Sequence, residues 1–176
     1  MSLKRIKLLA VLGIFLISFG AHFIYNLFPN VLISFFFPIN ESIFEHMKII
    51  FTSTLLYGII DYFLLRKNNV TFNNFSFQLF FSAISSIVIF LLIFLPIHYL
   101  FGESLIVTLI ILFITYIISQ VISYILLKHP DLGILNKLSL VLIILVYINF
   151  IVLTYTSDKD DFFYDTYSNS SYILNE

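Results

Sequence analysis

Residues 105–127 read LIVTLIILFITYIISQVISYILL, a run that contains no charged side chain. A helix needs about 20 consecutive apolar residues to cross the hydrocarbon core of a bilayer. Comparable apolar runs cover about residues 6–27, 42–65, 77–95 and 135–155. In lipid only helices and closed barrels satisfy every backbone polar group, and these runs are continuous rather than alternating. The sequence therefore predicts an all-α, polytopic membrane bundle of about five transmembrane helices.

Composition limits what else the chain contains. Of 176 residues, 60% are hydrophobic and only 11% are charged, which leaves no room for a separate soluble domain. We expect residues 1–156 to form one transmembrane helical domain and residues 157–176 to form an acidic extracytoplasmic tail. A net charge of −1 gives no reason to expect nucleic-acid binding. The absence of cysteine excludes disulfides, thiol nucleophiles and Cys-bound zinc.

Basic residues predict the orientation. If the runs alternate across the membrane, seven basic residues fall on one side: Lys4, Arg5, Lys7, Arg66, Lys67, Lys128 and Lys137. The positive-inside rule then places the N-terminus in the cytoplasm and the C-terminus outside. An alternative interpretation of the first run is a cleaved signal peptide, but it continues beyond the usual length of such a core. The many Ile, Phe, Asn, Tyr and Lys residues favour an AT-rich bacterial genome, and hence a bacterial plasma membrane.

The second apolar run is entered through residues 38–48, PINESIFEHMK, which place two carboxylates, an imidazole and an ammonium group at the start of a membrane helix. Residues 28–38 before it are too apolar for an aqueous loop and too short to span a bilayer. We expect an interfacial or re-entrant segment bracketed by Pro29 and Pro38. Ionisable groups at membrane depth are costly and usually mark function or water access. The sequence thus predicts a polar site at the outer membrane face.

Part of this cluster has a purely structural explanation. Ser42 followed three residues later by Glu45 matches a capping box, and a glutamate suits the positive end of a helix dipole. At 100° per residue, Glu41, Glu45 and Lys48 share one helical face, and Ser42 and His46 share the adjacent one. Two ionised carboxylates one turn apart repel each other unless a cation lies between them. Either Lys48 or a metal ion, with His46 as nitrogen donor, would meet that need.

The candidate residues fall into three predicted roles. The candidate catalytic residues are Glu45, His46 and Glu41. The candidate substrate-binding residues are Asn40, Ser42, Lys48 and Tyr25. The candidate ligands of a divalent metal ion are His22, His46 and Glu45. His22 is included because an imidazole inside an apolar helix needs a polar partner, but the spacing matches no specific metal motif. We expect His98, Glu103 and the aspartates of the tail to lie at about the same depth in the membrane as these candidate residues.

Other polar positions are predicted to be structural. Asp61 lies close to Arg66 and Lys67 in sequence, which favours an interfacial ion pair among snorkelling side chains. The third and fourth runs carry small or polar residues of the kind that membrane helices use for packing. These are Ser82, Ser85, Ser86, Ser119, Gln120, Ser123 and Tyr124.

The run His22-Phe23-Ile24-Tyr25, followed by INESIFEHMK at residues 39–48, resembles a family of small bacterial integral membrane proteins that is common in Gram-positive species. The family pattern reads approximately His-aromatic-x-Tyr, then Val/Ile-Asn-Glu-Ser-x-aromatic-Glu-His-Leu/Met-Lys. The resemblance is strongest over the first third of the chain and continues through residues 122–124 and 163–165. The tail departs from the pattern, because it lacks a Pro-rich lead-in and a closing Tyr-Gly. The resemblance implies an integral membrane protein and brings no established activity.

Three classes of function remain open. We favour a membrane protein that acts on or binds a lipid or lipid-linked substrate at the outer leaflet. Glu45 or Glu41 would be its acid or base, and Lys48 its headgroup contact. The alternative is a non-enzymatic binding or accessory protein for a headgroup or a membrane partner. The third is a small transporter that acts as an oligomer, although no inverted repeat is visible. No Gly-x-Ser-x-Gly, His-Glu-x-x-His or paired-aspartate motif is present.

Overall fold

The computed structural model describes residues 1–102, 104–157 and 162–163, and the regular structure within these ranges is helical throughout. The elements in chain order are α1 (Leu3–Leu27), α2 (Val31–Ser34), α3 (Ile43–Lys67), α4 (Phe75–Phe101), α5 (Leu105–Lys128) and α6 (Ile134–Thr156). Five of these helices are long and apolar enough to cross a membrane, all but the short α2. The prediction of an all-α bundle with five spanning helices is confirmed.

One predicted boundary is wrong. We expected the third long helix to end before Pro96, but α4 continues through Pro96 to Phe101. Proline is tolerated inside membrane helices because neighbouring groups and local adjustments satisfy the carbonyl that its missing N–H leaves free. The helix ends instead at Gly102, whose φ of +78° suits glycine and whose N–H donates to the His98 carbonyl at 2.8 Å.

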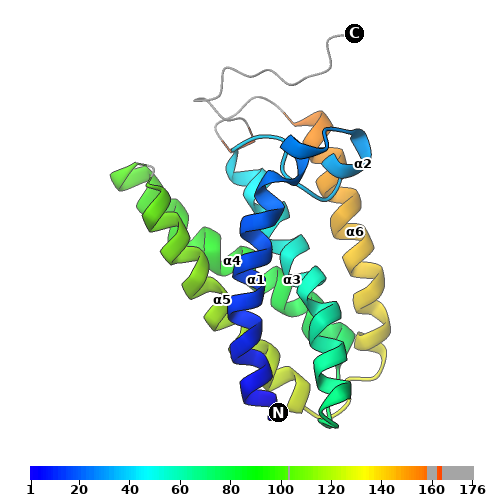
Figure 1. The fold of residues 1–176 in the computed structure, drawn as a ribbon. Helices are drawn as coiled ribbons and strands as arrows, with labels where there is room; N and C mark the ends of the chain where they lie inside the picture. The colour runs from blue at the N-terminus through cyan, green and yellow to red at the C-terminus, as the bar shows by residue number, and fades with distance from the viewer. Residues whose placement is uncertain (103, 158–161, 164–176) are drawn as a thin grey trace.

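The helix α3 is the centre of the bundle. It packs against α1 and α4, α5 covers α1 and α4, and α6 packs against α4 (Figure 1). Most of α3 is buried, whereas α6 is largely exposed along its apolar length. The large apolar side chains on the outside of the bundle fit a lipid environment. The most polar of the spanning helices is therefore also the one most enclosed by protein, as expected for ionisable groups at membrane depth.

Two glycines allow close helix packing. A Cβ built on Gly13 of α1 would lie 2.0 Å from the ring of Tyr57 on α3. A Cβ built on Gly58 of α3 would lie 2.4 Å from the Leu79 side chain on α4. Gly20 of α1, by contrast, has no heavy atom within 4 Å of such a position. Gly13 and Gly58 thus let a large side chain from the facing helix sit against the backbone.

Buried small polar residues occur on both α4 and α5. Ser82 and Ser86 of α4 are buried, as are Ser119 and Ser123 of α5. The Ser123 hydroxyl donates to the side-chain carbonyl of Gln78, which links the two helices. This contact of Ser123 agrees with the role in helix packing that was predicted for the small polar residues.

The bundle has two chemically different ends. The α2 end comprises the last turn of α1, α2 and the start of α3, and the basic end comprises the first turn of α1, the α3–α4 turn and the α5–α6 turn (Figure 1). The seven basic residues used above to predict orientation belong to the basic end. Most of the predicted acidic tail, and Glu103, lie outside the described residues. Within them, Phe162 returns to the α2 end, where its carbonyl accepts the Phe44 N–H at 3.0 Å.

Candidate functional site

The first turn of α3 is capped by the residues just before it. The Ser42 hydroxyl accepts the backbone N–H of Glu45 at 3.3 Å, and the Asn40 side-chain oxygen accepts the N–H of Ser42 at 2.9 Å. Because the helix begins after Ser42, Glu41 lies in the preceding turn. The prediction that Glu41 shares a helical face with Glu45 and Lys48 is therefore wrong. A helical-wheel argument does not apply to a residue outside the helix.

Glu45 and Lys48 form a buried ion pair. The Lys48 Nζ lies 2.6 Å from the Glu45 Oε2, and their side chains are only 0% and 2% exposed. The Glu45 carboxylate also accepts the N–H of Ile39 at 3.0 Å and the hydroxyl of Thr154 at 3.2 Å. Lys48 donates to the carbonyl of Ser34 at 2.9 Å and to the hydroxyl of Thr154 at 3.0 Å. Hydrogen bonds thus satisfy both the carboxylate and the ammonium group of the pair, and they connect α3 to the α2 segment and to α6.

Residues 28–38 fold back along α3. The Phe36 carbonyl accepts a hydrogen bond from the hydroxyl of Thr52, well inside α3, at 2.8 Å. The Tyr147 hydroxyl of α6 donates in turn to Thr52 at 3.1 Å. The Ser34 and Tyr155 hydroxyls are 2.6 Å apart. A re-entrant segment, as expected for residues 28–38, would make contacts this far along α3. Its backbone polar groups cannot bond to lipid and therefore need partners in the protein.

A second group of polar residues forms around Glu41. The His22 Nε2 of α1 lies 3.2 Å from one carboxylate oxygen of Glu41, and the His46 Nε2 of α3 lies 3.9 Å from the other. One ligand atom from each of the three residues lies within 4.8 Å of the other two. The three side chains thus converge from α1, α3 and the turn before α3, and we call them the His22–Glu41–His46 group.

The orientation of the His46 ring gives this group its chemical character. The Nδ1 of His46 lies 2.8 Å from the carbonyl of Ser42, which can only accept, so Nδ1 carries the hydrogen. In the neutral ring the other nitrogen, Nε2, then presents a lone pair, and it faces the carboxylate of Glu41. Two acceptors that face each other at this distance need a donor or a cation between them: a water molecule, a proton on Nε2 or a metal ion would each serve. A ring nitrogen bonded to a backbone carbonyl is also the usual second-sphere arrangement of a metal-binding histidine.

Glu41 is charged under ordinary conditions. Its side chain is 53% exposed, compared with 27% for His22 and 29% for His46. The hydrogen bond from His22 holds the pKa of the Glu41 carboxyl below its usual range, and the two imidazoles act in the same direction when charged. An ionised carboxylate beside two imidazoles is a donor set that suits zinc and other divalent transition metals.

A largely apolar cavity of 240 Å³ lies beside the two histidines. We call it the α2-end cavity. His22 and His46 form part of its wall, together with Phe19 on α1, Phe90 on α4 and Leu109 on α5. Because most of its other lining is also apolar, the cavity offers a hydrocarbon-like volume with polar groups at one side.

The structure separates the residues predicted from sequence into two groups. His22, Glu41 and His46 come together beside the cavity, whereas Glu45 is held by Lys48. The carboxylate next to the two histidines is therefore that of Glu41, and the predicted ligand Glu45 lies in the ion pair. Ser42 serves as the N-cap of α3, and Asn40 stabilises the turn before it. Tyr25 is half-buried on α1.

Some partners in this region were not singled out from the sequence. Thr154 and Ser34 complete the hydrogen bonds of the buried pair, and Tyr155 contacts Ser34. Each is an isolated hydroxyl in an apolar stretch, which is too common a pattern to single out. Their roles depend on how α2 and α6 meet α3, which no local pattern indicates.

Asp61 occupies a different position from the one predicted. It pairs with Lys7 of α1 rather than with Arg66 or Lys67, and Asp61 is 2% exposed. The expectation of an interfacial pair near the end of α3 is therefore wrong. The physical reason is that α1 packs along α3, so that Lys7 supplies the charge across the helix interface.

Comparisons with known proteins identify a family. A family model described as "Family of unknown function (DUF6512)" matches residues 1–173 of the chain. No curated protein matches the chain, and no solved structure matches it.

Proposed function

The chain belongs to the DUF6512 family of unknown function, and we propose that it is a metal-dependent membrane protein acting on a lipid-like substrate. In this proposal the His22–Glu41–His46 group binds one divalent metal ion. The α2-end cavity receives an acyl or isoprenoid chain of the substrate, and the metal contacts its polar head. The observation that carries the proposal is the pairing of the His46 Nε2 lone pair with the Glu41 carboxylate beside an apolar cavity.

The spacing of the three donors supports a metal of the size of zinc. Ligands about 2.0–2.1 Å from a tetrahedral Zn²⁺ lie about 3.3 Å from one another. The nitrogen–oxygen distances of 3.2 Å and 3.9 Å, which run to different oxygens of Glu41, are close to this value. One ligand atom from each residue lies within 4.8 Å of the other two, so the three side chains would draw together around the ion. Two histidines with one carboxylate also suit non-haem Fe²⁺, which makes iron the second metal to test.

The number of protein ligands favours a chemical role over a purely structural one. Structural zinc sites are usually closed by four protein ligands, whereas catalytic sites have three and leave a position for water or substrate. Here His22, Glu41 and His46 are the three described residues that converge. A divalent ion at this place would polarise a carbonyl or phosphoryl oxygen of the substrate and activate a water molecule.

The substrate class follows from the surroundings of the group. A cavity with mostly apolar walls binds a hydrocarbon chain, and the imidazoles at its wall mark where the polar head would lie. The reaction that fits is hydrolysis of an ester or phosphoester bond in such a molecule. The oxygen of water would be added to the acyl or phosphoryl group, and the leaving oxygen would depart with a proton as an alcohol.

The test uses the purified full-length protein in vesicles of phosphatidylethanolamine and phosphatidylglycerol, with added Zn²⁺ or with chelator. We expect mass spectrometry to detect a hydrolysed lipid with Zn²⁺ and to detect none with chelator. His46→Gln should abolish the product, and His129→Gln, at the opposite end of the bundle, should not. Metal-dependent retention of an unchanged lipid would overturn the hydrolysis and support the accessory binding role. If neither hydrolysis nor retention of lipid depends on the metal or on His46, the whole proposal is overturned.

A further inference from the structure

A second cavity lies away from the histidines. It has a volume of 540 Å³ and lies between α1 and α5, near the basic end. We call it the basic-end cavity. Its apolar walls come from both helices and include Leu8, Val11, Phe113 and Ile117. This volume falls in the range of about 300–1,000 Å³ that is typical of small-molecule sites.

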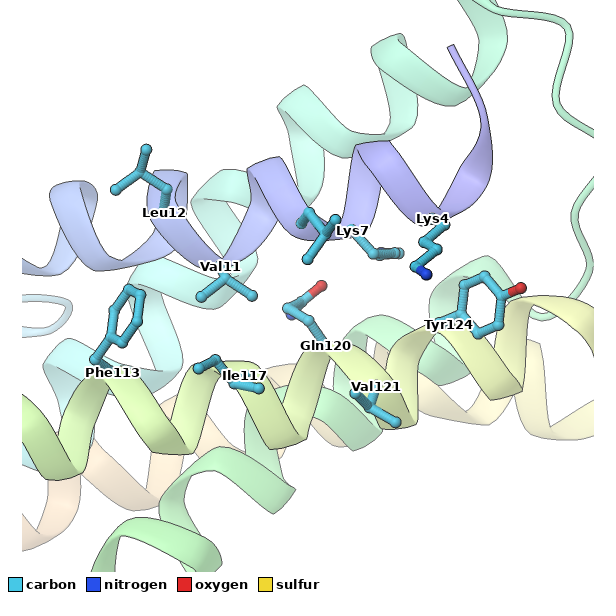
Figure 2. A pocket seen from close by; sticks show the side chains of 10 residues that line it. Lys4, Lys7, Val11, Leu12, Phe113, Ile117, Gln120, Val121 and Tyr124 are labelled. Atoms are coloured by element: carbon cyan, nitrogen blue, oxygen red, sulfur yellow. The ribbon is translucent and has the colours of Figure 1, made fainter.

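The lining of this cavity is more polar at one end than at the other. Figure 2 shows Lys4 and Tyr124 together at one end of the lining, with Leu12 and Phe113 at the other. Gln120 projects from α5 toward α1 between these two ends (Figure 2). The cavity is therefore amphipathic along its length, with a cationic mouth and a hydrocarbon-like interior.

The positive charge at the mouth is available to a ligand. Lys7 also lines the cavity, but it is already paired with Asp61. Lys4 is exposed, and among the described residues neither Lys4 nor Lys128 takes part in an ion pair. The Lys128 Nζ lies 4.5 Å from the centre of the Tyr124 ring, which brings a second cation close to the mouth.

We propose that the basic-end cavity binds an anionic glycerophospholipid, with one acyl chain between α1 and α5 and the headgroup phosphate at Lys4. A lipid of the adjacent leaflet would enter in its ordinary orientation, because the cationic mouth lies at the end of the bundle and the apolar walls lie deeper. Basic pockets between membrane helices characteristically bind anionic headgroups. Gln120 and the Tyr124 hydroxyl would offer hydrogen bonds to ester or phosphate oxygens. This site is independent of the proposed metal site.

An anionic lipid fits the charges better than the other occupants. Zwitterionic phosphatidylcholine would bring a trimethylammonium group next to Lys4 and Lys128, without a described carboxylate at the mouth to accept it. An apolar helix of a second copy would cover the hydrocarbon walls but would leave both cations unmatched. Free phosphate would meet the cations but would leave the apolar interior unfilled.

The experiment measures lipid retained by the purified full-length protein. The protein is equilibrated in micelles with phosphatidylglycerol, with phosphatidylcholine or with inorganic phosphate, and native mass spectrometry counts bound molecules. We expect one phosphatidylglycerol to be retained in preference to phosphatidylcholine, and no effect of inorganic phosphate on thermal unfolding. Lys4→Gln should weaken phosphatidylglycerol retention about fivefold, because one basic residue near an anionic surface contributes about that factor. Lys137→Gln removes a cation from the same end but not from the cavity, and should have no such effect.

A second pair of variants tests the apolar part of the site. Val121 lines the cavity and is 54% exposed, whereas Val141 on α6 is 52% exposed and is not part of the lining. Val121→Trp should fill the cavity and abolish preferential retention, and Val141→Trp should leave it unchanged. Three outcomes would each overturn the proposal. They are equal retention of the two lipids, equal effects of Lys4→Gln and Lys137→Gln on retention, and replacement of the bound lipid by inorganic phosphate. A dimer that survives excess phosphatidylglycerol and is broken by Val121→Trp would also overturn it, in favour of a second copy.

Discussion

The Nζ of Lys48 and the Oε2 of Glu45 are 2.6 Å apart in the interior of the protein, one turn along the same helix. Their remaining hydrogen bonds go to Ser34, Ile39 and Thr154, so that a single ion pair joins three segments of the chain. A buried ion pair adds little to folding stability compared with apolar side chains of the same shape. The loss of one partner is costly, however, because it leaves the other charge buried without compensation. We therefore expect Glu45 and Lys48 to position the turn that carries Glu41.

Glu45→Gln should therefore destabilise the protein by about 3–5 kcal/mol. The free energy of unfolding in mixed micelles measures the effect. Glu41→Gln is the matched control, because it makes the same chemical change at a half-exposed position, and it should cost less than about 1 kcal/mol. A double variant that combines Glu45→Gln with Lys48→Met should lose less stability than the sum of the losses in the two single variants. If Glu45→Gln costs no more than Glu41→Gln, the pair does not hold this region together.

The packing of α1 against α3 gives a second prediction. Gly13→Ala should destabilise the protein by about 1–3 kcal/mol, because the new methyl group would lie 2.0 Å from the buried Tyr57 ring. Gly20→Ala, on the same helix, should be neutral or stabilising by up to about 1 kcal/mol, since nothing lies within 4 Å and alanine favours helix. Thermal unfolding in the same detergent compares the two. Equal effects of both changes would contradict the helix pairing in Figure 1.

The pairing of Asp61 gives a third prediction, which separates the sequence-based interpretation from the structure. Asp61→Asn should cost about 3 kcal/mol, because it leaves the buried Lys7 without its counter-charge. A double-mutant cycle of Asp61→Asn with Lys7→Gln should show strong coupling, and a cycle with Arg66→Gln should show almost none. Stronger coupling to Arg66 than to Lys7 would restore the interfacial pair that the sequence suggested.

The affinity for metal gives a fourth prediction, because it should depend on pH in a defined direction. Metal binding requires all three donors to be deprotonated. The hydrogen bond from His22 lowers the pKa of the Glu41 carboxyl, so protonation of this group adds little pH dependence near neutral pH. A histidine ligand must give up its proton to bind a metal ion, so Zn²⁺ binding should weaken by about tenfold or more between pH 7.5 and 5.5. Calorimetric titrations at several pH values test this, and an affinity that stays constant or rises toward pH 5.5 would contradict it.

The long helices could be predicted from the sequence because their signal is local. A run such as residues 105–127 has the length and composition that lipid demands, and no tertiary contact changes that requirement. The end of α4 was not predictable in the same way. Proline ends most helices in water, but here the membrane helix continues past Pro96 to a glycine with positive φ.

The position of the candidate site along the chain could be predicted from the sequence. The arrangement of its side chains in space could not. The ionisable residues between Asn40 and Lys48 were recognisable because they contrast with the surrounding apolar chain. Which carboxylate met which cation depended on where α3 begins and on how α1 and α6 pack against it. A start after Ser42 leaves Glu41 outside the helix, next to His22 of α1, and places Glu45 in the interior with Lys48.

Binding of a divalent metal ion by His22, Glu41 and His46 can be measured by calorimetric titration of metal-free, full-length protein with Zn²⁺. We expect one Zn²⁺ per chain, with binding at least about tenfold weaker in Glu41→Gln and in His46→Gln. His129→Gln should bind as the unaltered protein does. A titration without saturable binding, or a loss of binding in His129→Gln as large as that in His46→Gln, would show that these three residues do not form a metal site.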